Sequence, residues 1–185
     1  MADREALRDF QRRLADRLQA APAAGAQAAW LAVEARGARY LIPLAQAGEI
    51  FPEAGVHPVP YTQPWFLGVA SLRGALHGVV DLARLLAAQV GPAPDPDCPA
   101  PAAPAAEAQW VTFSAALEVP CALRVDRLVG LRGREAHTAS RSPPEGAPDW
   151  LGAVLQDAGG MSWQSIDLQR LSQQPQFLRI GSRSD

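Results

Sequence analysis

Arg73 is the residue of this sequence whose chemistry and setting best suit the binding of another molecule. It stands with Gly74 between two short runs of alternating apolar residues. A glycine there can adopt the positive φ that a two-residue hairpin turn requires, so we expect the arginine at a hairpin tip. Its planar guanidinium carries five donors and can bind carboxylates or backbone carbonyls of a partner. An intramolecular salt bridge that orients the turn fits equally well, and the spacing leaves both interpretations open.

No residue pattern typical of a catalytic or metal site occurs. The three histidines, His57, His77 and His137, lie in separate segments, and none has a second ligand at metal-binding spacing on a helix. There is no Gly-x-Ser-x-Gly nucleophile motif and no glycine-rich phosphate loop. Lysine is absent altogether, which excludes Schiff-base chemistry and phosphate-binding lysines. We therefore expect no enzyme activity, no metal and no cofactor.

Residues 65–85 are the segment that positions Arg73. Apolar residues alternate on both sides of the turn, which predicts two short strands. Asp81 then precedes a run of good helix formers at residues 82–86. Its carboxylate can accept hydrogen bonds from the free N–H groups of a first helical turn, so Asp81 is predicted to be a helix N-cap.

The same alternation predicts the other strands. They form a hairpin over residues 30–43 with its turn at Arg36–Gly37, a short strand or turn at Glu49–Ile50, a second hairpin over residues 110–125, and a strand over residues 126–133. Two segments rich in proline, residues 91–108 and 136–148, are predicted to be loops, the first of them exposed.

The two halves of the chain contain similar elements in the same order. Residues 150–152, Trp-Leu-Gly, are similar to the Trp65–Gly68 segment, and residues 166–171 are similar to residues 80–85, with an Asp-Leu pair in each. Such a repeat predicts two similar small β-subdomains, and many short strands between turns favour barrels. The second copy has Asp-Ala-Gly-Gly at residues 157–160 where the first has the Arg-Gly turn. We therefore expect a functional arginine in the first copy only.

The N-terminal segment has the pattern of an amphipathic helix. Leu7, Phe10, Leu14 and Leu18 recur at spacings of three and four among charged residues, and we expect this helix either to pack on the body or to bind a partner. The segment has no apolar core, so it is not a signal peptide, and no run approaches the ~20 apolar residues of a membrane span. The two cysteines are too few for a disulfide framework. These features favour a cytoplasmic protein.

The segment around Arg73 resembles the central signature of CheW-like domains, the coupling proteins of bacterial chemotaxis arrays. The matching residues are Gly68, Val69, Leu72, Arg73, Gly74, Val79, Asp81 and Leu82. One departure is Gly78, where the family usually has proline, with His77 in a normally apolar position. The resemblance extends from about Trp30 to Leu171, while the N-terminal helix and the C-terminal tail look more like the PilI branch of type IV pilus and twitching-motility systems.

The resemblance implies a fold, a function and a set of partners. The fold would be mainly β, with two five-stranded, SH3-like barrels packed together, an N-terminal amphipathic helix and short helices. The protein would be a non-enzymatic adaptor that links a methyl-accepting chemoreceptor to a CheA-type histidine kinase and is recruited to membrane receptor arrays. Arg73 and Glu49 would contact the receptor, whereas Gly68, Gly74 and Asp81 would be structural. The expected divisions are 1–28 for the helix and linker, 29–173 for the domain with its two intertwined barrels, and 174–185 for the tail.

A nucleic-acid-binding β-barrel of SH3 or OB type is the alternative from another functional class. Such a module needs a basic groove with interleaved aromatic residues. The chain has 17 basic and 19 acidic residues and a net charge of −2, and its five tryptophans are spread along the sequence. The charge balance and the spread therefore favour the adaptor.

Overall fold

The computed structural model describes residues 28–90, 108–143 and 145–181, which form a mainly β fold, as predicted. The strands are β1 Ala28–Ala35, β2 Ala38–Pro43, β3 Ala47–Pro52, β4 Phe66–Leu72, β5 Ala75–Asp81, β6 Gln109–Phe113, β7 Cys121–Val125, β8 Arg127–Gly133, β9 His137–Arg141, β10 Leu151–Asp157 and β11 Ser162–Ile166. The helices are α3 Leu82–Val90, α4 Leu168–Gln173 and α5 Pro175–Leu178, with 3₁₀ turns η2 Ala115–Leu117 and η3 Arg134–Ala136.

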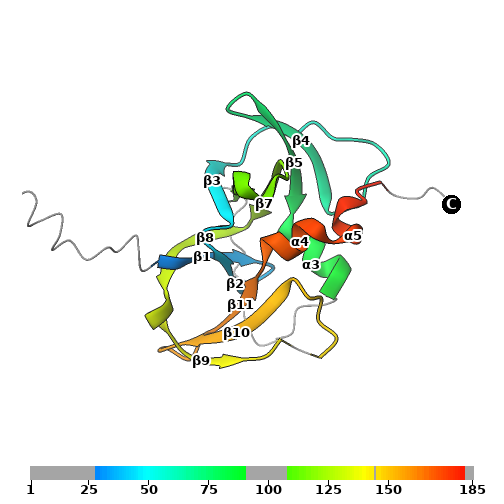
Figure 1. The fold of residues 1–185 in the computed structure, drawn as a ribbon. Helices are drawn as coiled ribbons and strands as arrows, with labels where there is room; N and C mark the ends of the chain where they lie inside the picture. The colour runs from blue at the N-terminus through cyan, green and yellow to red at the C-terminus, as the bar shows by residue number, and fades with distance from the viewer. Residues whose placement is uncertain (1–27, 91–107, 144, 182–185) are drawn as a thin grey trace, which may run out of the picture.

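The strands form two sheets, one above the other in Figure 1. The upper sheet has the order β3-β6-β7-β5-β4, and the lower sheet has the order β8-β1-β2-β11-β10-β9. The upper sheet is curled and closed at its two ends. His57, in the segment after β3, pairs with Val69 of β4 through two backbone hydrogen bonds of 2.8 and 2.9 Å. In the lower sheet, η3 connects the two end strands β8 and β9.

Strand β9 corrects the prediction that residues 136–148 form a loop, and it gives the lower sheet six strands instead of the expected five. It pairs with β10 from Arg141↔Val154 to His137↔Asp157. Four of its five residues are exposed, so the segment has no alternating apolar pattern that could reveal a strand. Backbone pairing with a neighbour far along the chain decides its conformation.

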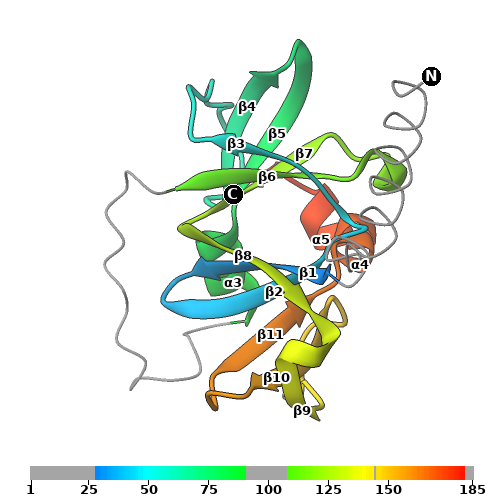
Figure 2. The ribbon, with the colours of Figure 1, turned by 90° about the vertical axis from the view of Figure 1, so that its left-hand side faces the viewer.

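Each sheet contains strands from both halves of the chain, as Figure 2 makes visible through the colours of neighbouring strands. The first hairpin, β1–β2, joins the lower sheet through a parallel pairing of Tyr40 with Gln164 on β11. The hairpin β6–β7 joins the upper sheet through a parallel pairing of Gly78 with Cys121. The two subdomains are therefore intertwined.

Three clusters of buried apolar side chains hold the fold together. The largest lies between the sheets and includes Leu31 and Val33 of β1 together with Leu82 and Leu85 of α3. A second cluster around Trp110 belongs to the upper sheet, and a third around Trp163 belongs to the lower one. Alternation along β1 sends Leu31 and Val33 into the shared core and Ala32 into the cluster of the lower sheet.

The internal repeat is visible as two matching corners. The N–H of Asp81 donates to the carbonyl of Trp65 at 2.9 Å, and the N–H of Asp167 donates to the carbonyl of Trp150 at 2.8 Å. Both aspartates then cap a helix, since each carboxylate accepts from the N–H three residues on, Arg84 or Arg170, at 3.0 Å. The predicted N-cap role of Asp81 is thus confirmed.

Some predicted segments lie wholly or partly outside the described residues. These are the N-terminal amphipathic helix, the linker up to residue 27 and the proline-rich loop up to residue 107. Ala108, the last residue assigned to that loop, is buried. The segment assigned to the tail begins with α5, whose Phe177 stacks on Trp65 and Phe113 at centroid distances of 5.8 and 6.0 Å. Among the described helices, none has the length and apolar character to cross a membrane.

Candidate docking surface

The hairpin turn between β4 and β5 presents Arg73, as the sequence predicts. Arg73 and Gly74 both have positive φ, 48° and 83°, and Leu72 pairs with Ala75 to close the turn. Positive φ at both central residues matches the twist of the flanking strands. The arginine side chain is 75% exposed, so the tight turn leaves most of a charged group open to solvent.

Glu49 is fixed by a bulge in β3. The register of β3 against β6 shifts between Ala47 and Ile50, and in this bulge the buried Thr112 hydroxyl accepts from the Glu49 N–H at 2.7 Å and donates to its carbonyl at 3.2 Å. Gly48 permits this approach, because a Cβ there would lie 2.8 Å from the Phe113 carbonyl oxygen. Gly48 and Thr112 belong to no motif in the sequence, so their role in positioning Glu49 is visible only in the structure.

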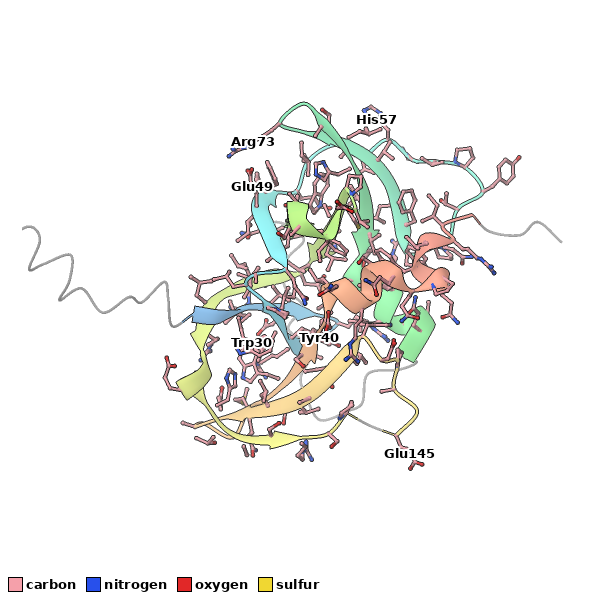
Figure 3. The ribbon with its side chains drawn as sticks, viewed as in Figure 1. Trp30, Tyr40, Glu49, His57, Arg73 and Glu145 are labelled. Atoms are coloured by element: carbon pink, nitrogen blue, oxygen red, sulfur yellow. The ribbon has the colours of Figure 1, made fainter. Side chains whose placement is uncertain are left out.

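The structure brings Glu49 and Arg73 together. Arg73 Nε lies 2.9 Å from Glu49 Oε2, and the guanidinium carbon is 5.9 Å from the centre of the Phe51 ring. Figure 3 shows the two charged side chains close together at the left-hand edge of the upper subdomain. The intramolecular salt bridge that the spacing left open is therefore present.

The ion pair contributes little to stability. Arg73 is 75% and Glu49 52% exposed, and pairs in that range are typically worth about 0–1 kcal/mol because water and salt screen them. Both side chains can consequently exchange their mutual contact for contacts with another molecule at a small cost. Ile50, directly after Glu49, and Leu76, three residues after Arg73, are exposed apolar residues. We call Glu49, Ile50, Arg73 and Leu76 the docking surface.

The other signature residues have structural roles. Gly68 has a φ of 137°, and a Cβ there would overlap the carbonyl oxygen of His57, at the pairing that closes the upper sheet. Gly78 donates its N–H to the Pro120 carbonyl at 2.9 Å. The proline that the family usually has at this position could not make that bond.

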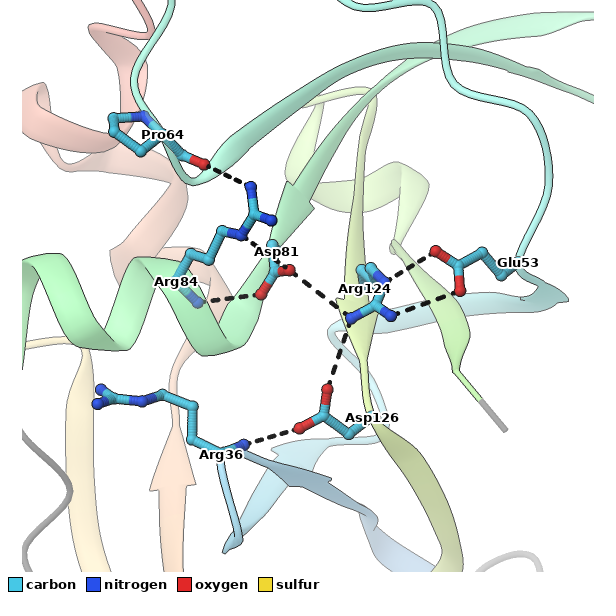
Figure 4. A network of polar contacts seen from close by, with 7 residues as sticks. All are labelled: Arg36, Glu53, Pro64, Asp81, Arg84, Arg124 and Asp126. Carbon is cyan, nitrogen blue, oxygen red and sulfur yellow. Dashed lines mark hydrogen bonds and ion pairs between the residues drawn. The ribbon is translucent and has the colours of Figure 1, made fainter. Parts of the chain in front are cut away.

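Asp81 belongs to a network of charges that joins the subdomains (Figure 4). Arg124 Nη1 lies 3.6 Å from Asp81 and 3.5 Å from Asp126, and its Nε donates to Glu53 at 2.9 Å. The hydrogen bond with Glu53 and the nearby carboxylates raise the pKa of Arg124, so the guanidinium stays charged. Asp126 also accepts from the N–H of Arg36, in the β1–β2 turn, at 2.8 Å.

The described residues contain no cluster of three or more His, Cys, Asp or Glu side chains that could hold a metal ion. Two buried groups that do not belong to the docking surface also have displaced pKa values. Burial raises the pKa of Tyr40, and it raises the pKa of Cys121 to about 12, which leaves that thiol inert.

The family follows from a comparison over most of the chain. Residues 29–176 match the family model described as "CheW-like domain". The chain belongs to the CheW-like family. Its resemblance to the crystal structure of the scaffolding protein TtCheW from Thermoanaerobacter tengcongensis has a TM-score of 0.57 at 13% identity and covers 76% of this chain and 88% of that one. At that identity the likeness shows the fold alone. The comparison with curated proteins gives no match.

Proposed function

We propose that this CheW-like chain is an adaptor that couples a methyl-accepting chemoreceptor to a CheA-type histidine kinase. The receptor would bind at the docking surface, with Arg73 and Glu49 as its charged contacts. Family membership supports the coupling role. The observation that carries the assignment of the surface is the exposed Arg73–Glu49 pair, in which a rigid turn and a bulged strand hold opposite charges 2.9 Å apart.

The mechanism needs no chemistry from the chain itself. An adaptor that binds two proteins at once raises their effective concentration near each other, so a modest affinity at each surface suffices. It also couples their conformational equilibria, because a conformational change in one bound partner alters the conformational preference of the other through the adaptor. The polar network around Arg124 and the shared core between the sheets suit this role, because they connect the two subdomains.

We further propose that the protein works in the cytoplasm at receptor arrays and serves a type IV pilus pathway, as expected of the PilI branch. The grounds are the family and the sequence features of the two ends of the chain. Co-purification with a histidine kinase of a pilus system, compared with one of a flagellar system, tests this assignment.

The nucleic-acid alternative has little support in the structure. Single-stranded nucleic acids bind by stacking bases on exposed aromatic rings. Trp65, Trp110, Trp150 and Trp163 are all buried, and Trp30 is half-buried. The tryptophans are therefore used for packing.

Receptor pull-down with matched arginine variants tests the proposal. Arg36 provides the control, because it occupies a turn of the same kind, with φ of 54° followed by Gly37 at 73°, in the other subdomain. We expect Arg73→Ala to weaken receptor association and Arg36→Ala to leave it near the wild-type level. Equal retention of receptor by the wild type and the Arg73 variant would refute the role of Arg73.

A further inference from the structure

A second exposed surface lies where the C-terminal segment meets the loop before β4. Val59, Tyr61, Leu178 and Ile180 are four of the eight large apolar residues that are exposed in the described part of the chain. Tyr61 is 77% exposed and Leu178 is 56% exposed. Exposed apolar residues that occur singly need no explanation, but a group of them in one place marks an interaction site. We call these four residues the Tyr61 patch.

Backbone hydrogen bonds hold the two halves of the Tyr61 patch together. Gln63 donates its N–H to the Ile180 carbonyl at 2.7 Å, and Thr62 forms an antiparallel bridge with Gly181. Directly before Leu178, the buried Phe177 anchors α5 by stacking on Trp65 and Phe113. The patch is therefore preorganised, which reduces the entropy that a partner must overcome on binding.

The backbone of Tyr61 is strained. Its φ is 59°, a left-handed conformation that costs an L-residue roughly 1–2 kcal/mol. Thr62 stabilises the turn by donating its hydroxyl hydrogen to the Val59 carbonyl at 2.8 Å. The chain thus holds an aromatic ring in solvent at an energetic cost, and exposed tyrosines are among the residues that contribute most to protein interfaces.

The charges around the Tyr61 patch are positive. Arg179 lies between Leu178 and Ile180, and it forms no ion pair with any described carboxylate. Arg84, which is largely exposed, reaches the same loop, where its Nη1 donates to the Pro64 carbonyl at 3.3 Å while its Nε lies 3.6 Å from the buried Asp81 carboxylate. Residues 57–65 and 176–181 contain no Asp or Glu. An apolar centre with a basic edge is complementary to an apolar segment flanked by carboxylates.

A second copy of this chain does not fit as the occupant. A two-fold interface would place the patch against itself, and the Arg179 side chain of each copy would then meet a surface whose segments, residues 57–65 and 176–181, contain no carboxylate. We propose that the Tyr61 patch binds an amphipathic segment of a partner protein, with Leu or Phe on one face and Glu or Asp at its flanks. In Figure 1, α5 lies on the right and β3 on the left, so this surface is separate from the docking surface and its assignment does not depend on receptor binding.

Fluorescence anisotropy with two labelled synthetic peptides tests this proposal. Both have an apolar face of Leu and Phe and about five helical turns, but one is flanked by Glu and the other by Lys. We expect the full-length protein to bind the acid-flanked peptide at least about tenfold more tightly. Arg179→Glu should abolish that preference, whereas Leu131→Ser, at an exposed apolar residue of β8, should change nothing.

Tyr61→Gly separates binding from folding. Glycine accepts positive φ without strain, so this variant should melt at or above the wild-type temperature and yet bind the acid-flanked peptide at least about tenfold less tightly. Equal affinity for the two peptides, no binding of either, or an equal loss in Leu131→Ser would overturn the proposal. Sedimentation velocity that shows a dimer, dissociated by Tyr61→Gly, would also overturn it, because the occupant would then be a second copy. Tighter peptide binding after removal of residues 1–27 would overturn it too, because the occupant would then be the chain's own N-terminus.

Discussion

Arg73 and Glu49 form an ion pair between opposite ends of one sheet. Glu49 is on β3, the strand at one end of the upper sheet, and Arg73 is in the turn that joins β4 and β5 at the other end. The contact exists because the sheet curls and closes through His57 and Val69. The pair is thus a product of the closed sheet, although it adds little to the stability of that sheet.

Exchanging the two charges distinguishes a structural from a binding role. The double variant Arg73→Glu with Glu49→Arg retains an ion pair, and we expect its unfolding free energy to lie within about 1 kcal/mol of the wild type. Receptor binding should be lost in both single variants and should stay lost in the double variant, because the partner meets reversed charges. Pull-down and urea denaturation measure the two quantities. Recovery of binding in the double variant would show that only the intramolecular pair matters.

Gly68→Ala should be among the most destabilising single substitutions in the upper sheet. The new Cβ would overlap the His57 carbonyl oxygen, and the φ of 137° is unfavourable for alanine. We expect a loss of about 3 kcal/mol in unfolding free energy, measured by urea denaturation. Gly74→Ala is the matched control, since a Cβ there meets nothing within 4 Å and adds only the strain of φ 83°, about 1 kcal/mol. Similar losses in both variants would contradict the steric explanation.

The two helix caps should differ in importance. Asp81 is buried and, besides capping α3, neutralises Arg124 at 3.6 Å, whereas the carboxylate of Asp167 is partly exposed. We expect Asp81→Ala to lower the unfolding free energy by about 2 kcal/mol or more and Asp167→Ala by about 1 kcal/mol. Thermal melts of the two variants give the comparison, and an equal shift in both would mean that the charge network adds no more to Asp81 than the Gln46 hydrogen bond, at 3.0 Å, adds to Asp167.

The turn between β10 and β11 should weaken in acid. Hydrogen bonds from the Trp163 indole at 3.0 Å and from the N–H groups of Met161 and Gly159 lower the pKa of Asp157. A carboxyl group whose pKa is lower in the folded than in the unfolded state stabilises the fold at pH values above its unfolded-state pKa, about 3.9. That contribution is lost as the pH falls through the folded-state pKa. In Asp157→Asn the stability should change less over that range. Tryptophan fluorescence during acid titration monitors it, and parallel curves for both proteins would refute the assignment.

Cys121 should resist alkylation in the native protein. Burial raises its pKa to about 12, so very little of the reactive thiolate is present at neutral pH, and the sulfur is inaccessible. Iodoacetamide followed by peptide mass spectrometry should find residue 121 unmodified until guanidinium chloride unfolds the chain. Rapid native labelling at this position would show that β7 opens readily.

The local features of this protein can be predicted from neighbouring residues alone. The Arg73–Gly74 turn, the cap at Asp81 and the first hairpin all follow from a few neighbouring residues, because turn and cap energetics depend on local backbone conformation. The family signature lies in the same short segment, so the sequence was also sufficient to indicate the family.

The contacts between distant segments, in contrast, become known only from the three-dimensional fold. The contact of Arg73 with Glu49, the insertion of β6–β7 beside β5, and the pairing of exposed β9 with β10 depend on residues far apart in the chain. The Tyr61 patch likewise needs the C-terminal segment to reach the loop before β4. Such contacts form because the strands must pair their backbone N–H and C=O groups and bury one shared apolar core. The same local elements could be arranged in many ways, and the energy of these long-range contacts selects one arrangement.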